Sequence, residues 1–79
     1  RYFMKITEFK NRVSSLISFI GFEYEGKSCG IDPINKSHFE MWCGDNYIVA
    51  KSIDEVMNTK IFNGHSLSEI YPQITNLDY

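Results

Sequence analysis

The sequence predicts an α+β fold with an N-terminal amphipathic helix, a three-stranded antiparallel meander and two short C-terminal helices packed on the sheet. Three observations support this prediction. Apolar residues recur at helical spacing near the N-terminus, apolar and polar residues alternate in the middle, and two helix-capping motifs occur near the C-terminus. We expect residues 1–79 to form one domain, because no linker or low-complexity segment interrupts the chain. Met4 fits a natural start, which makes Arg1–Phe3 an expected remnant of the expression vector.

The N-terminal helix is predicted from a stripe of apolar residues at spacings of three, four, three, one and three. At 100° per residue, these residues share one face about 100° wide. They are Ile6, Phe9, Val13, Leu16, Ile17 and Ile20. Thr7 is the expected N-cap, and Gly21 stands where a left-handed residue would end the helix. Leu16 lies in the middle of the stripe, so we expect it to be among the most enclosed side chains.

The sheet is predicted from alternation of apolar and polar residues in the middle of the chain. Residues 22–25 alternate, and after a break that contains glycine an apolar segment leads to a turn at 33–37. Residues 38–43 alternate again, and a second turn at 44–46 leads into a last strand at 47–51. These segments predict strands joined by tight turns.

The two C-terminal helices are predicted from matching capping boxes, in which a serine caps one backbone N–H and a glutamate reaches back to another. The first box spans Ser52 to Glu55 and the second spans Ser66 to Glu69. Asn63-Gly64 is the expected turn between the helices, and Pro72 limits the second helix.

Residues 21–28 match the phosphate-binding pattern G-x-x-x-x-G-K-[ST]. A functional loop of this kind follows a strand and opens a helix, whereas here a predicted helix precedes the motif. Asp32-Pro33 would end any helix that began at Lys27, and Glu23 and Glu25 would place negative charge beside a polyphosphate. We therefore expect no nucleotide and no other cofactor.

Cys29, His38, Cys43 and His65 offer the ligand types of a structural zinc site, but none of them form a closely spaced pair. If the first turn is centred on Lys36, Cys29 lies opposite Cys43 on the core face of the sheet. We expect both cysteines to be small apolar core residues and the chain to bind no metal.

No catalytic residue is expected, because no nucleophile lies beside a histidine with a third group to orient it. The net charge of −2 combines +3 over residues 1–20, from four cations and one anion, with −5 over residues 21–79, from four cations and nine anions. Neither value indicates a nucleic-acid or membrane partner, so nucleic acid is not expected to bind. The chain has no long apolar run and no secretory leader pattern, so we expect a cytoplasmic protein. Its abundance of Ile, Asn, Lys, Phe and Tyr hints at an A/T-rich bacterial or phage genome.

The remaining feature is the second face of the strand at 38–43, which carries His38, Glu40 and Trp42. We favour the interpretation that Trp42 is core beneath the last helix. In the alternative, these three residues form a candidate protein-binding face, for an unknown protein partner or for a second copy of the chain. The functional hypothesis is a non-enzymatic protein–protein interaction module or accessory factor, with a mobile element as the candidate source of its gene. The alternative is a nucleic-acid-associated regulator that uses the basic N-terminal helix.

Overall fold

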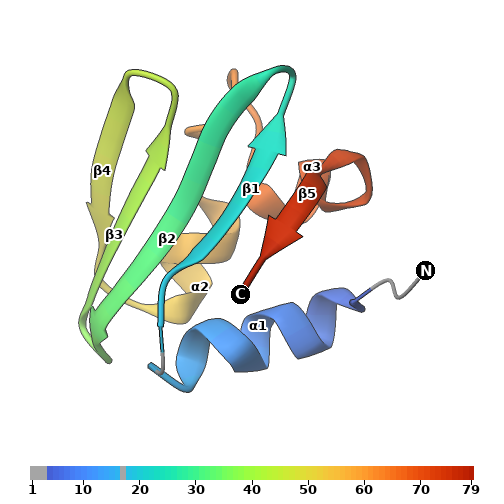
Figure 1. The fold of residues 1–79 in the computed structure, drawn as a ribbon. Coiled ribbons are helices and arrows are strands. Elements are labelled where there is room, and N and C mark those ends of the chain that lie inside the picture. Colours follow the sequence, from blue (N-terminus) through green and yellow to red (C-terminus); the bar gives the residue numbers. More distant parts are fainter. Residues whose placement is uncertain (1–3, 17) are drawn as a thin grey trace.

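The computed structural model describes residues 4–16 and 18–79, so Arg1–Phe3 and the stripe residue Ile17 lie outside the described residues. One helix precedes four consecutive strands, and the remaining helices precede a last strand, with all helices on one side of a single sheet (Figure 1). In chain order they are α1 (Ile6–Ser14), β1 (Ile20–Tyr24), β2 (Lys27–Asn35), β3 (His38–Cys43), β4 (Asn46–Ala50), α2 (Ile53–Asn58), α3 (Leu67–Ile70), the short 3-10 helix η1 (Tyr71–Gln73) and β5 (Thr75–Asp78).

The sheet confirms the α+β class but corrects the expected three-stranded meander. It has five antiparallel strands in the order β4-β3-β2-β1-β5. Strands β1 to β4 follow one another as hairpins, while β5 returns from the C-terminal part of the chain to pair with β1 (Figure 1).

The two additional strands come from features with weak sequence signals. Residues 20–35 form two strands because Glu25 and Gly26 make a tight turn with positive φ values of 51° and 75°. Such a turn usually carries Asn or Asp before the glycine, so with Glu25 in that position the sequence lacks the usual signal of a turn. Strand β5 has only four residues, and Asn76 within it has a φ of 53°.

The register between β2 and β3 is the one expected from a turn centred near Lys36. Cys29 lies opposite Cys43, and Ile31 lies opposite Met41. The pairing shifts by one residue between Pro33 and Asn35, which is a β-bulge that absorbs the extra residue next to the turn.

Helix α1 is shorter than predicted, because it ends at Ser14 and its N-cap is Lys5 rather than Thr7. The hydroxyl of Ser14 donates to the Lys10 carbonyl, and that of Ser15 donates to the Arg12 carbonyl, so both serines compete with helix propagation. Leu16 then adopts a left-handed φ of 60° and is only half-buried. The expectation that Leu16 is among the most enclosed side chains is therefore wrong. The expectation that Gly21 ends the helix is also wrong, since Gly21 lies within β1.

Both C-terminal helices begin at the predicted serines, but only one of them has the full capping box. The hydroxyl of Ser66 accepts a hydrogen bond from the Glu69 N–H, and the Glu69 carboxylate accepts one from the Ser66 N–H. At α2, Ser52 caps the Glu55 N–H, while the Glu55 carboxylate accepts from the Lys51 N–H instead. The predicted turn at Asn63-Gly64 is present, with both residues at positive φ.

The core lies between the helices and one face of the sheet. An aromatic cluster fills its centre, where Phe9 contacts Phe22 and Tyr71 at ring-centroid distances of 6.3 and 5.1 Å. The Tyr71 hydroxyl also donates a hydrogen bond to the Met4 carbonyl, which fastens the chain before α1 to η1. The buried side chains that complete this core come from β1 to β4 and from all three α-helices, and half-buried Leu77 of β5 packs against them.

Candidate functional site

The opposite face of the sheet carries no helix in the described part of the chain (Figure 1). The burial pattern of β3 alternates strictly, with Phe39, Met41 and Cys43 buried and the residues between them half-buried. We call the uncovered side the open face. Strand alternation assigns to it Gly21, Glu23, Ser28, Gly30, Asp32, His38, Glu40, Trp42, Tyr47 and Val49.

The structure places the three predicted site residues together on the open face. His38 Nε2 lies 3.5 Å from a carboxylate oxygen of Glu40, and both side chains are more than one-third exposed. Trp42 follows two residues further along β3 and is half-buried.

The favoured interpretation that Trp42 is core beneath the last helix is wrong. Its indole instead lies over Gly30, the residue directly opposite on β2. A Cβ atom built on Gly30 would come within 2.3 Å of Trp42 Cζ2, so the indole occupies the space that any side chain at position 30 would need. Trp42 therefore packs directly on the backbone of Gly30, in the space left by the missing side chain, and we call this position the seat of Trp42.

Tyr47 is a member of this surface that sequence reasoning missed. It lies directly opposite Trp42 on β4 and is 56% exposed. Partial desolvation, together with the negative charge of Glu40 and a hydrogen bond with its carboxylate, raises the pKa of Tyr47. The link from Glu40 to Tyr47 ties the polar part of the open face to its aromatic part. The signal that could have found Tyr47 was the two-residue turn before it, which fixes the pairing of Trp42 with Tyr47.

Phe19 adds a third aromatic ring to the open face, beside β1. A Cβ built on Gly21 would lie 3.4 Å from Phe19 Cε2, so the Phe19 ring approaches the sheet over this glycine. Its ring is 51% exposed. Two glycines of the open face, Gly21 and Gly30, are therefore each covered by an aromatic ring.

The open face is acidic where it is charged. Glu23, Asp32 and Glu40 occupy it, and none of the ten open-face positions defined above holds a lysine or an arginine. A partner for this face would have to supply apolar surface for the aromatic rings and cationic groups for the carboxylates.

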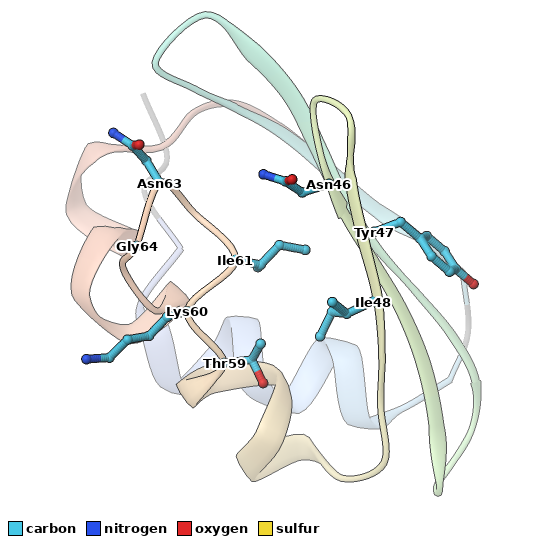
Figure 2. Close-up of a pocket in the computed structure, with 8 residues that line it drawn as sticks. All are labelled: Asn46, Tyr47, Ile48, Thr59, Lys60, Ile61, Asn63 and Gly64. Carbon is cyan, nitrogen blue, oxygen red and sulfur yellow. The ribbon is translucent and has the colours of Figure 1, made fainter.

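A groove of about 470 Å³ lies beside β4, between this strand and residues 59–64 (Figure 2). Ile48 and Ile61 point into it from the two sides, whereas Tyr47 points away toward the open face. Asn46, Lys60 and Asn63 supply polar groups around the groove. The groove has no titratable pair and no buried polar side chain, so its geometry favours contact with a chain over chemistry on a small molecule.

The fold does not assemble the phosphate-binding loop or the zinc site whose residue types occur in the sequence. The phosphate-loop pattern at 21–28 spans the β1–β2 hairpin, and strand β2 follows it where a phosphate-binding loop requires a helix. Within residues 4–16 and 18–79, no group of three or more metal-ligating side chains comes together. Cys29 and Cys43 are buried on the core face, whereas His38 lies on the open face and His65 in the loop before α3.

The two thiols nevertheless form a close pair, with Cys29 Sγ 3.0 Å from Cys43 Sγ. Burial, reinforced by the hydrogen bond between the two thiols, raises the pKa of Cys29 to about 12. Because the thiolate is the nucleophilic and metal-binding form, this environment suppresses the reactivity of Cys29 at neutral pH.

Comparisons of the chain with protein-family models, with curated proteins and with solved structures found no match. None of the helices in the described part of the chain has the length and apolar character needed to cross a membrane.

Proposed function

We propose that this chain is a non-enzymatic protein-binding module that engages a protein partner through the open face. The observation that carries the proposal is the aromatic pair of half-buried Trp42 and exposed Tyr47, on a sheet face that no described helix covers. Tryptophan and tyrosine are enriched at binding hot spots because they bury a large area at a small cost in conformational entropy.

The polar groups beside this pair give the face its specificity. The Glu40 carboxylate lies 3.5 Å from His38 Nε2 and accepts a hydrogen bond from the Tyr47 hydroxyl. A cationic side chain of the partner would meet Glu40 and Asp32, while apolar groups of the partner would cover Trp42. Rigid strands hold all of these residues, so little ordering is needed on binding.

The runner-up hypothesis, a nucleic-acid-associated regulator that uses α1, has weaker support. Lys10 pairs with Asp54 at 3.8 Å, and the Arg12 guanidinium lies 5.2 Å from the centre of the Tyr79 ring. Two cations of this helix are thus engaged within the chain, and the acidic open face would repel phosphates. A mobility shift with DNA or RNA that weakens as salt is raised would favour this alternative.

The proposal is tested by photo-crosslinking in the source cell. A photoreactive phenylalanine analogue replaces Tyr47 in one variant and Asn58, an exposed residue of α2 on the helical side, in a matched control. We expect a discrete crosslinked protein with the analogue at position 47 and none at position 58. In addition, Glu40→Lys should abolish the crosslink by reversing the charge of the face. Equal crosslinking at both positions, or a crosslink that survives Glu40→Lys, would contradict the proposal.

A further inference from the structure

Strand β4 is an edge strand that lacks the usual protection against pairing with another strand. It lies at one end of the sheet and consists of Asn-Tyr-Ile-Val-Ala, with no charge and no proline. Sheet edges normally carry lysine, proline, a bulge or a very short strand to prevent such pairing. The opposite edge is protected in this way, because β5 has four residues and pairs irregularly with β1.

The turn before β4 determines which backbone groups face outward. Gly44 and Asp45 form a two-residue turn between Cys43 and Asn46, and such a turn is flanked by a hydrogen-bonded pair. Hydrogen-bonded and non-hydrogen-bonded pairs then alternate along the hairpin. Residues 46, 48 and 50 therefore bond to β3, whereas Tyr47 and Val49 direct their N–H and C=O groups away from the sheet.

We infer that β4 pairs antiparallel with β4 of a second copy of this chain, about a twofold axis at Ile48. This register places Tyr47 opposite the partner's Val49 and Val49 opposite the partner's Tyr47. All the outward-facing N–H and C=O groups of both residues are then paired. The two five-stranded sheets become one continuous sheet, and the edges at β4 disappear.

Charge complementarity supports a second copy as the occupant. Asp45 and Lys51 flank β4 at equal distances from Ile48, so the same register brings Asp45 opposite the partner's Lys51 at both ends of the interface. Both side chains are exposed, and neither belongs to an ion pair in residues 4–16 and 18–79. An unrelated extended peptide would not carry these two charges in the matching positions.

The side chains on both faces of β4 fit this pairing. Ile48 faces the groove and would meet the partner's Ile48, which lies close to it in a non-hydrogen-bonded pair. On the open face, Tyr47 would meet the partner's Val49 beside Trp42, an aromatic and β-branched pair of the kind that stabilises sheets.

Sedimentation equilibrium of the full chain, at about 10 to 500 μM, tests the inference. We expect a monomer–dimer equilibrium. Val49→Pro removes an outward-facing N–H without removing a bond to β3, so it should leave the circular dichroism spectrum unchanged and raise the dimer Kd at least about tenfold.

A charge exchange tests the register with variants that leave the backbone intact. Asp45→Lys places lysine opposite the partner's Lys51 at both ends and should raise the dimer Kd about tenfold. The double variant Asp45→Lys/Lys51→Asp restores both pairs and should return the Kd toward the wild-type value. A wild-type chain that is monomeric over the whole range, or a dimer whose Kd is unchanged by both Val49→Pro and Asp45→Lys, would overturn the inference.

Discussion

The indole of Trp42 lies over Gly30, its direct cross-strand neighbour, so closely that a Cβ on the glycine would fall 2.3 Å from the ring. Glycine within a strand weakens the sheet because it has no side chain to pack. An aromatic residue opposite the glycine compensates by covering the exposed backbone. This pair therefore serves two purposes, since it stabilises the sheet and it fixes the orientation of the aromatic group on the open face.

Gly30→Ala should displace the indole, because the new methyl group and the ring cannot occupy the same space. We expect a loss of about 1–3 kcal/mol in the free energy of unfolding, as for an overpacked site. The fluorescence of Trp42 should shift to longer wavelength as the ring moves into water. Denaturant unfolding followed by circular dichroism measures the first effect and emission spectroscopy the second.

Gly21→Ala is the matched control for this substitution. Its Cβ would lie 3.4 Å from Phe19 Cε2, at ordinary contact distance, and the residue has no positive φ. It should unfold close to wild type and leave the tryptophan emission unchanged. If Gly30→Ala behaves in the same way as Gly21→Ala, the indole is not seated on Gly30.

Phe9→Ala should be the most damaging change in α1. Phe9 is fully buried and packs edge-on against Phe22 and Tyr71. Its truncation should cost about 3–5 kcal/mol in the free energy of unfolding. A domain of this size is stabilised by only about 5 kcal/mol, so much of the population should be unfolded at room temperature. Thermal melting followed by circular dichroism measures the loss.

The control in the same helix is Asn11→Ala, because Asn11 is exposed and alanine is the better helix former. This variant should melt at or slightly above the wild-type temperature. A larger loss in Asn11→Ala than in Phe9→Ala would show that the helix presents its other face to the sheet.

The capping box of α3 should make stability depend on pH. The Glu69 carboxylate accepts a hydrogen bond from the Ser66 backbone N–H, and this bond is the main reason that the pKa of Glu69 is lowered. A group with a lowered pKa stabilises the fold fully above its ordinary pKa, and this stabilisation is lost as pH falls through the lowered value. We expect Tm to fall between about pH 5 and pH 3, and to fall less steeply in Glu69→Gln, which has no charge to lose. Identical pH profiles for the two proteins would exclude this contribution.

The thiol of Cys29 should be inert in the folded protein. Its pKa of about 12 leaves a negligible thiolate fraction at pH 8, and the side chain is buried. An aromatic disulfide reagent should therefore modify neither cysteine until denaturant is added. Ser37→Cys, at an exposed turn position, supplies a reactive thiol for comparison. Modification of Cys29 at the rate of this exposed thiol would contradict the prediction.

Zinc should play no part in the stability of the fold. Incubation with a strong chelator is expected to leave Tm unchanged, because no three metal-ligating side chains come together in residues 4–16 and 18–79. Stoichiometric zinc in the purified protein, with a fall in Tm after its removal, would refute this expectation.

The sequence predicted those parts of the fold in which one physical signal dominates. Strict alternation predicted the two faces of β3, and the turn centred near Lys36 predicted the pairing of Cys29 with Cys43. The serine caps of α2 and α3 were also identified. In each case the local preference and the tertiary structure agree.

The errors arose where a local pattern continued past a change of structure. The apolar spacing of α1 runs on to Ile20, but Leu16 turns the chain at a left-handed φ and Ile20 belongs to the sheet. Periodicity could not reveal this break, because a left-handed leucine has no sequence signature.

The position of Trp42 could not be predicted from β3 alone. Whether a helix covers the second face depends on where the C-terminal part of the chain crosses the sheet. The seat provided by Gly30 depends on the register of two strands rather than on either sequence alone.

The return of β5 to the sheet also divides the assembly of the protein into a fast and a slow stage. The pairings within the β1–β4 hairpins close short loops. The pairing of Gly21 with Asp78 closes a loop that spans most of the chain, and closing a longer loop costs more chain entropy. Folding should therefore begin in the hairpins and end with the docking of β5 on β1. By the same reasoning, amide hydrogen exchange in the native protein should be fastest in β5, which would peel away while the other four strands stay paired.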